Sequence, residues 1–282
     1  VYNWSTLTNN QQIAFNASTD KLTFDDLTVS AMSPALGWSG DTTTISFSGK
    51  IVTLLANVRS LTTSNVTFAN GSLLVVGDNL TTTAGDDSAN TLTGGAGSDG
   101  LYGLGGNDTI FGGDGDDYIR TGYTTGPIGN DVIDGGTGTD VIVYNYTTST
   151  PAITANMATH TITSDQGVLS FTNIERIYGT SQNDVFIGGD PAHGIDSLGN
   201  SISEVFRGEG GSDTISGAAG NNFSTIASYT TNSSNQAISV DLHSGSVVDG
   251  LGGTDTLVNV RTIWGGSGND QIKGGSLTRS AN

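Results

Sequence analysis

A nine-residue pattern, G-G-x-G-x-D-x-U-x with a large apolar residue at U, limits the fold of this chain more than any other feature. Three copies run without a break from residue 94, as GGAGSDGLY, GLGGNDTIF and GGDGDDYIR. A degenerate copy, GDDSANTLT, begins at residue 85, and GPIGNDVID and GGTGTDVIV begin at residues 126 and 135. Further copies begin at residues 179, 199, 208, 217, 250 and 265. Repetition at a fixed period predicts a solenoid in which each unit packs on its neighbours.

Each unit divides into a turn of about six residues and a strand of about three, so that two units make one coil of a flattened parallel solenoid. Glycine at the first, second and fourth positions allows backbone conformations that are closed to residues with a Cβ, and it lets carbonyl oxygens turn inward. One apolar side chain per strand is expected to point into a narrow core. These predicted core residues are Leu101, Ile110, Ile119, Ile133, Ile142, Phe186, Phe206, Ile215, Leu257 and Ile272.

Stacking of the coils is expected to bring acidic side chains together. Asp99 should face Asp117, and Asp108 should lie near Asn90, because each pair is 18 residues apart. Turns without a cation would form a ladder of repelling carboxylates. Carboxylate and carbonyl oxygens without His or Cys favour Ca²⁺ over zinc or copper, and Mg²⁺ is disfavoured because it keeps its waters and needs a tighter octahedron.

Composition supports an all-β chain that binds cations. The 42 glycines, 4 prolines and many Ser, Thr and Asn residues argue against helices. A formal net charge of −18 argues against nucleic acid as a partner. No apolar run approaches the roughly 20 residues that cross a bilayer, so we expect no transmembrane segment, and no signal peptide is visible. The chain has no cysteine, which removes disulfides and thiolate metal sites.

The rise in glycine and acidic content after residue 80 predicts a domain boundary there. Residues 1–80 are read as a small antiparallel β domain with Trp4 and Trp38 in or near its core. Two hairpins are predicted in it, one turning at Ser48-Gly49 and one at Asn70-Gly71, a pair suited to a type I′ turn. Three β-roll arrays with β-rich connectors should follow, over residues 81–143, 144–225 and 226–282. The connectors share a longer period, since Asn183-Asp184 recurs as Asn269-Asp270, 86 residues later.

The nonapeptides resemble the RTX, or hemolysin-type, calcium-binding repeats, which form parallel β-rolls in secreted bacterial toxins, proteases, adhesins and surface-layer proteins. The resemblance covers about residues 85 to 275 and is most specific from residue 94 to 143. It implies one Ca²⁺ between two stacked turns. The lower turn would supply the carbonyls of its second and fourth positions and its aspartate, and the upper turn the carbonyls of its first and third positions and its aspartate.

Carried over to this chain, the resemblance implies four sites. The first joins Gly95, Gly97 and Asp99 to Gly112, Asp114 and Asp117. The second joins Leu104, Gly106 and Asp108 to Gly126, Ile128 and Asp131, provided that residues 121–125 bulge outward. The third joins Gly113, Gly115 and Asp117 to Gly135, Thr137 and Asp140. The fourth joins Thr180, Gln182 and Asp184 to Gly208, Gly210 and Asp213.

Several copies depart from the family pattern. Asn90, Glu204 and Asn222 stand where the pattern has aspartate. A site formed by Asn90 with Gly103, Gly105 and Asp108 is therefore expected to be weaker or empty. Asp255 and Asp270 have the right local sequence but no obvious partner 18 residues away.

The resemblance implies a chain that leaves the cell unfolded by type I secretion and folds where Ca²⁺ is abundant. We expect a secreted or bacterial cell-surface structural protein that self-assembles or adheres, as part of a surface layer, matrix or adhesin. No catalytic motif such as G-x-S-x-G or H-E-x-x-H occurs, so we expect no enzymatic activity. The alternative is a non-catalytic accessory region of a larger secreted hydrolase, lyase or toxin. A third possibility is that residues 1–80 bind a cell-surface glycan.

Overall fold

The structure, a computed structural model, describes residues 1–122, 129–144, 150–189, 203–218, 224–230 and 237–274. The described residues form two compact units, one of Val1–Ile142 with Leu169–Ile174 and the other of Val143–Val168 with Glu175–Asn282. Strands dominate both, and the described residues contain no helix long and apolar enough to cross a membrane. The predicted ligands Gly126 and Ile128 lie outside the described residues.

The N-terminal part of the first unit is a mixed β structure. Its elements are β1 (Tyr2–Asn3), η1 (Trp4–Thr6), β2 (Gln11–Ile13), β3 (Leu22–Phe24), β4 (Ala35–Ser39), β5 (Thr42–Phe47), β6 (Lys50–Leu54), η2 (Val58–Ser60) and β7 (Val66–Phe68). The predicted antiparallel pairing holds for β4, β5 and β6. By contrast, β1, β3 and β7 pair in parallel, as do β2 and β6.

One predicted hairpin is confirmed and the other is wrong. Ser48 and Gly49, both with positive φ, turn β5 into β6. Gly71 also has a positive φ, yet β7 pairs with β3, and β8 (Leu74–Val76) pairs in parallel with β10 (Gly100–Tyr102). All three residues of β8 are buried, and a strand buried on both faces needs more than a local hairpin partner. β8 therefore belongs to the roll, although it precedes the boundary predicted at residue 80.

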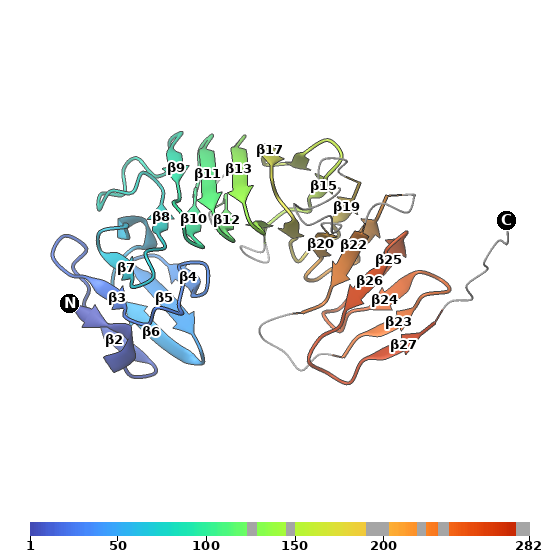
Figure 1. The fold of residues 1–282 in the computed structure, drawn as a ribbon, viewed down its shortest axis with the longest axis horizontal. Helices are drawn as coiled ribbons and strands as arrows, with labels where there is room; N and C mark the ends of the chain where they lie inside the picture. The colour runs from blue at the N-terminus through green and yellow to red at the C-terminus, as the bar shows by residue number, and fades with distance from the viewer. Residues whose placement is uncertain (123–128, 145–149, 190–202, 219–223, 231–236, 275–282) are drawn as a thin grey trace. The chain divides into compact units, whose positions relative to one another are not determined.

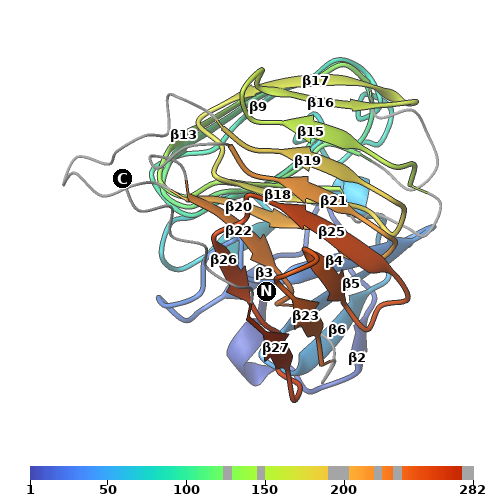
Figure 2. The same cartoon turned by 90° about the vertical axis from the view of Figure 1, so that its right-hand side faces the viewer.

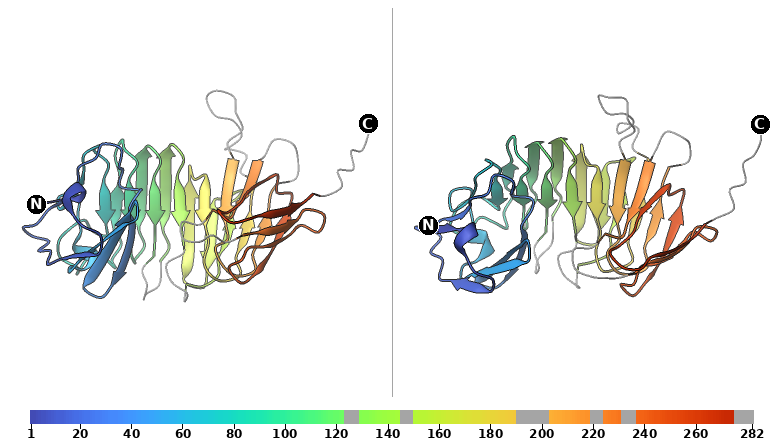
Figure 3. Two further views of the ribbon diagram at one scale, coloured as in Figure 1. Left: turned by 90° about the horizontal axis from the view of Figure 1, so that it is seen from below. Right: turned by 60° about the horizontal axis from the view of Figure 1, so that its bottom comes forward.

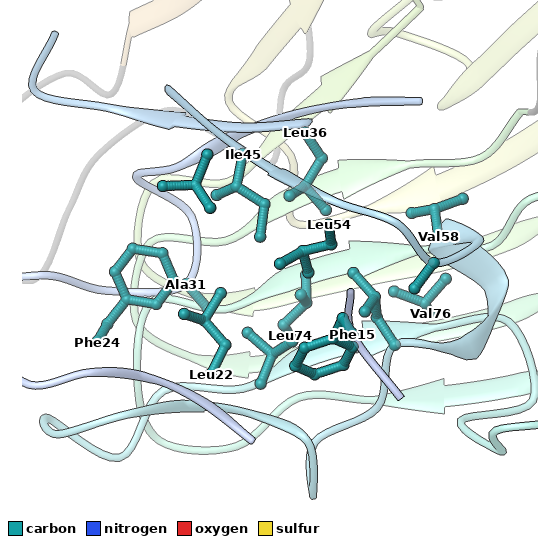
Figure 4. Packing of buried hydrophobic residues seen from close by; sticks show 14 of the residues in the cluster. Phe15, Leu22, Phe24, Ala31, Leu36, Ile45, Leu54, Val58, Leu74 and Val76 are labelled. Carbon is teal, nitrogen blue, oxygen red and sulfur yellow. The ribbon is translucent and has the colours of Figure 1, made fainter. Parts of the chain in front are cut away.

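A single apolar core joins the N-terminal strands to the first coils of the roll. Trp4 stacks on Phe24 with 4.6 Å between ring centroids. Figure 4 shows Phe24 and Leu22 in the same cluster as Leu74 and Val76 of β8. The partly buried Trp38 packs against this core and meets the ring of Tyr102 edge-on at 6.1 Å. Both tryptophans thus lie where the sequence predicts.

The rest of the first unit is a parallel β-roll with two ladders of short strands. One ladder contains β8, β10, β12 (Tyr118–Arg120) and β14 (Val141–Val143), and the other contains β9 (Thr91–Thr93), β11 (Thr109–Asp114), β13 (Val132–Thr137) and β17 (Gly167–Thr172). Leu101 pairs with Ile119, and Ile110 pairs with Ile133. Figures 1 and 3 show these strands stacked side by side. The parallel roll predicted from the nonapeptides is confirmed.

The second unit repeats this arrangement and adds antiparallel hairpins. One ladder contains β18 (Arg176–Tyr178), β20 (Ser203–Arg207), β22 (Ser224–Ser228) and β26 (Thr262–Trp264), and the other contains β15 (Thr154–Asn156), β19 (Val185–Ile187), β21 (Thr214–Ser216) and β25 (Thr254–Val258). Figure 2 shows β19, β21 and β25 lying next to one another. The connectors supply β16 (Thr161–Ser164), β23 (Ser239–Asp241) and β24 (Ser246–Val248), and β27 (Gln271–Lys273) pairs with β23.

The predicted inward side chains fill the space between the paired ladders. Nine of the ten are buried, from Leu101 to Leu257. Ile272 is the exception, with 59% of its surface exposed. It lies on β27, which has β23 as its only neighbour among the described strands. The prediction fails for Ile272 because no further described coil covers it.

Candidate calcium-binding turns

The repeat aspartates are joined by a ladder of hydrogen bonds from one coil to the next. In the first unit the Asp99 N–H donates to Asp117 Oδ1, and the Asp117 N–H donates to Asp140 Oδ1, both at 2.8 Å. On the other side the N–H of Asn90 donates to Asp108 and that of Asp108 to Asp131, both at 2.9 Å. Each aspartate therefore lies directly above the one that the repeat pattern predicts.

The same ladder continues in the second unit. The Asp184 N–H donates to Asp213 Oδ1 at 2.8 Å, and the Asp213 N–H donates to Asp255 Oδ1 at 2.9 Å. Asp255 thus has a partner that the sequence did not reveal, because 42 residues separate the two. Asp270 accepts from the N–H of Ile238, so the coil beside it carries no acid at the matching position.

The second carboxylate oxygen of these residues faces the turn. Oδ2 of Asp108, Asp117, Asp131 and Asp213 is buried and has no hydrogen-bond partner among the described residues. For Asp108, Asp117 and Asp213, the Oδ2 atom lies against the glycine at the first position of the same nonapeptide. A Cβ on Gly112 would overlap the Asp117 carboxylate, and a Cβ on Gly208 would overlap that of Asp213. A buried, unpartnered carboxylate oxygen is costly, and a bound cation removes that cost.

Burial raises the pKa of these aspartates well above 3.8. The pKa of Asp108 and of Asp117 rises to about 7, and that of Asp131 and of Asp213 to about 8. The next carboxylate in the ladder adds to the shift, as Asp99 does for Asp117, while N–H donors oppose it. Without a cation these turns therefore favour the protonated form.

Carbonyl oxygens of the turns face the turns stacked next to their own. The Gly95 carbonyl accepts from the N–H of Asp114 at 2.9 Å, and the Gly97 carbonyl lies against Gly115, so both face the following turn. The Gly112 carbonyl lies against Gly94 and therefore faces the preceding turn. In the next gap, the Thr137 carbonyl accepts from the Gly115 N–H at 2.8 Å. Each of these carbonyls faces the turn with which the predicted ligand scheme pairs it, and its binding of Ca²⁺ stays a prediction.

Other carbonyls that were predicted as Ca²⁺ ligands also lie against a stacked turn. The carbonyls of Gly106, Gly113 and Gln182 lie against Gly129, Gly136 and Gly211 of the following turn, and that of Thr180 accepts from Gly210 at 3.3 Å. The Gly135 carbonyl lies against Gly112. Leu104 adopts a positive φ, as a turn residue. Among the described residues, three or more His, Cys, Asp or Glu side chains nowhere gather around one point, so carbonyls would have to complete any Ca²⁺ shell.

The substituted positions behave differently from the aspartates. The Asn90 amide nitrogen donates to the carbonyls of Gly85, Asp86 and Ser88 at 3.2, 3.3 and 2.9 Å. It thus points a positive dipole at carbonyls of its own turn. Gly103, which was predicted to share a site with Asn90, lies against the Asp108 carboxylate. For Gly105, the other glycine of that predicted site, the binding of Ca²⁺ stays a prediction.

Glu204 stands at an aspartate position, as predicted. The turn that its carboxylate contacts is not the one directly before it in the sequence but the one at Gly188 and Gly189. The Gly189 N–H donates to Oε1 of Glu204 at 2.8 Å, and a Cβ on Gly188 would overlap this carboxylate. The nonapeptide is therefore split into a turn that begins at Gly188 and a strand at 203–207. The strand register pairs Glu204 with Thr225, so Thr225 and not Asn222 takes the next equivalent position. Asn222 itself lies outside the described residues.

Two acids that the sequence analysis did not single out also belong to the turns. Asp86 and Asp249 are buried, and each has an Oδ2 without a hydrogen-bond partner among the described residues. Neither stands at the sixth position of a nonapeptide, so the repeat pattern carried no signal for them. The Asp78 N–H donates to Asp86 at 3.2 Å, and the Leu251 N–H donates to Asp249 at 2.8 Å.

Fold and turns together define a parallel β-roll of glycine-rich turns with inward-facing carboxylates. The family model of the RTX calcium-binding nonapeptide repeat, four copies long, matches residues 84–119, 128–145, 171–190, 198–223 and 262–276. The chain is an RTX repeat protein, and its repeats form a calcium-binding β-roll module. A search of the curated proteins finds no match to the chain.

Proposed function

We propose that this chain is a secreted or bacterial cell-surface structural protein whose roll folds on binding Ca²⁺ and then supports self-assembly or adhesion. The observation that carries the calcium-driven folding is the ladder of buried aspartates, each with one oxygen in a main-chain hydrogen bond and several with the other oxygen facing the turn unpartnered. RTX repeats are typical of secreted proteins, which supports an extracellular location.

Calcium acts as a folding switch because it binds the stacked turns and hardly binds the unfolded chain. Each site then adds RT ln(1 + [Ca²⁺]/Kd) to the free energy of unfolding, which is about 2.7 kcal/mol at a hundredfold excess over Kd. In a calcium-poor cytosol, the acidic chain with its net charge of −18 stays unfolded through self-repulsion. Outside the cell, the ions neutralise the turns and the coils close.

Self-assembly is supported by the open ends of the second unit. β26 and β27 each have a neighbour on one side only among the described strands. Trp264 and Ile272 on these strands are 38% and 59% exposed. An unpaired strand edge with exposed apolar side chains is a template for pairing with another strand. We propose that such pairing links copies of the chain or docks the roll on a further β module.

A calcium titration of the EDTA-treated protein tests this function, with circular dichroism and light scattering recorded together and Mg²⁺ as the control cation. The proposal expects that Ca²⁺ alone orders the chain and that particles then grow. If the chain orders and stays monomeric, self-assembly is wrong and the accessory-region alternative gains. If Ca²⁺ and Mg²⁺ act alike, the calcium switch itself is wrong.

The alternative is that the roll is a non-catalytic accessory region of a larger secreted hydrolase, lyase or toxin. Its support is that a calcium-folded roll serves equally well as the export and folding module of an enzyme. For the N-terminal strands we propose a cell-surface glycan as a partner. A binding assay with the purified chain and immobilised cell-wall glycans tests that partner, and no binding above a glycan-free matrix contradicts it.

A further inference from the structure

The turn pair at residues 208–213 and 249–255 carries more acid than the repeat pattern requires. β21 and β25 pair in parallel, and the Asp213 N–H donates to Asp255 Oδ1 at 2.9 Å. A Cβ on Gly253 would overlap the carbonyl of Gly211, so the two turns stack closely. Asp249 precedes the nonapeptide that begins at Gly250 and lies in the segment between β24 and β25.

Asp249 makes a contact that the repeat aspartate makes in two other turns. The Gly95 N–H donates to Asp99 at 2.5 Å, and the Thr180 N–H donates to Asp184 at 2.6 Å, so the second-position N–H is held by the sixth-position carboxylate. In the turn at 250–255 the corresponding donor is the N–H of Leu251, and it donates to Asp249 Oδ1 at 2.8 Å. Asp249 therefore accepts the N–H that the repeat aspartate accepts in those two turns.

The Asp255 carboxylate is meanwhile engaged on another side. It accepts the Asp213 N–H at 2.9 Å. Burial raises the pKa of Asp255 to about 6, and the Asp213 N–H and the nearby Tyr229 hydroxyl oppose this rise. The oxygens that are buried and unpartnered among the described residues of this turn pair are Oδ2 of Asp213 and Oδ2 of Asp249. Asp249 is only 3% exposed.

The surrounding charges leave this pair of oxygens uncompensated. Burial is the largest cause of the raised pKa of Asp213, and the charges that raise it further are those of Asp255, Asp184 and Asp249. Asp249 also raises the pKa of Asp255. The charge of Asp249 thus adds to those of the repeat aspartates Asp213 and Asp255, and a cation is attracted more strongly the more negative its surroundings are.

We propose that Asp213 and Asp249 bind a divalent cation, Ca²⁺, between the stacked turns 208–213 and 249–255, with main-chain carbonyls completing its shell. Asp249 lies outside the repeat pattern and replaces Asp255 as the second carboxylate ligand, while Asp255 adds charge without binding the ion directly. The inference rests on the proposed calcium-dependent function. It expects this site to keep its ion longest when a chelator is added.

The experiment counts Ca²⁺ ions per folded chain by equilibrium dialysis and elemental analysis, using four variants of the full chain. Asp249→Asn keeps the oxygen that accepts the Leu251 N–H but loses the second carboxylate oxygen, and it should bind one ion fewer than the unchanged protein. Asp255→Asn should keep the number of ions. Asp165→Asn removes an exposed acid and should bind as many ions as the unchanged protein. Asp117→Asn, in a regular repeat turn, should lose ions independently of this site.

An unchanged ion count in Asp249→Asn, or the loss of an ion in Asp255→Asn instead, would overturn the assignment. If both Asp249→Asn and Asp117→Asn keep all their ions, calcium binding by the turns fails and takes the proposed function with it. If Asp249→Asn does not fold in the presence of Ca²⁺, Asp249→Glu is used in its place. It retains the charge but displaces the oxygens, so one ion should be lost to a chelator earlier than in the unchanged protein. Identical chelator curves for the two proteins contradict the site.

Discussion

The main-chain N–H of Asp99 donates to the carboxylate of Asp117 at 2.8 Å, across 18 residues of chain. Asp117 is thus both part of the scaffold and a predicted ligand, since its Oδ1 aligns the coil below while its Oδ2 faces the turn. This double use couples coil register to ion binding. A cation bound at Asp117 keeps this carboxylate ionised and offsets its repulsion with the neighbouring carboxylates. The bound ion therefore also stabilises the hydrogen bond from the Asp99 N–H.

Asp117→Asn separates these two roles. The amide oxygen still accepts the Asp99 N–H, but an NH₂ group replaces the oxygen that faces the turn. Because Asp117 belongs to two of the predicted sites, we expect the variant to bind two ions fewer, with the remaining sites filled at the usual calcium concentration. Isothermal titration calorimetry gives the stoichiometry, and Asp165→Asn is the charge-matched control. A full complement of ions in Asp117→Asn contradicts the predicted ligand scheme.

Asn90→Asp is expected to add an ion. The Asn90 amide now donates to three carbonyls of the turn at 85–90, and a carboxylate at this position would repel them. A Ca²⁺ bound by the new carboxylate and Asp108 removes this repulsion, so the variant should gain one ion and depend more steeply on calcium for folding. Elemental analysis of the dialysed protein measures the gain. Equal ion counts in variant and unchanged protein would show that this gap cannot hold a cation.

Gly112→Ala is expected to disrupt the first array. The added Cβ would overlap both the carbonyl of Gly135 and the carboxylate of Asp117, which are part of the stacked turns. Forced overpacking of this kind costs about 1–3 kcal/mol or more of the free energy of unfolding. Urea denaturation in saturating calcium measures the loss. Gly274→Ala is the control, because a Cβ there meets no atom within 4 Å, and its midpoint should stay unchanged.

Calcium binding should release protons near neutral pH. The folded-state pKa of Asp117 rises to about 7 and that of Asp131 and Asp213 to about 8, all from 3.8. The metal-free folded chain therefore holds more protons than the unfolded chain between about pH 4 and 8, and its stability falls as the pH rises through this window. Calcium needs the ionised carboxylates, so its affinity should rise over the same window.

Calorimetry at pH 6.5 in two buffers of different ionisation enthalpy measures the protons released per ion. Circular dichroism of the EDTA-treated protein at pH 5 and pH 8 measures the other half of the prediction, with more residual structure expected at pH 5. The same binding enthalpy in both buffers would contradict the assignment of raised pKa values to these turns.

Removal of Ca²⁺ should change the fluorescence of Trp38. Its ring meets Tyr102 at 6.1 Å and the Arg120 guanidinium at 4.4 Å. Tyr102 and Arg120 end the strands that follow Asp99 and Asp117, so loss of the ion should loosen both contacts. We expect a red shift of tryptophan fluorescence on adding EDTA that disappears in Trp38→Phe. Trp4→Phe is the control and should keep the shift, since Trp4 stacks on Phe24 in the N-terminal core.

The roll could be predicted from the sequence because its rule is local and repeated. The pairing of Leu101 with Ile119 and of Asp99 with Asp117 follows directly from the nine-residue period. The Asn70-Gly71 hairpin failed because a turn signal says nothing about which strand will bury β8. The pairing of Asp213 with Asp255 could not be predicted, because an insertion between β21 and β25 hides the nine-residue period. The burial of Asp249 could not be predicted either, because this residue lies outside the nonapeptide pattern.

Asp213 and Asp255 are 42 residues apart in the sequence, yet the hydrogen bond between them, at 2.9 Å, is close to the 2.8 Å of the bond between Asp99 and Asp117, which are 18 residues apart. Coil closure in this protein therefore tolerates large differences in the length of chain between successive rungs. Each connection between successive rungs is therefore a place where evolution, or an engineer, can insert new sequence while the rungs on either side keep their hydrogen bond.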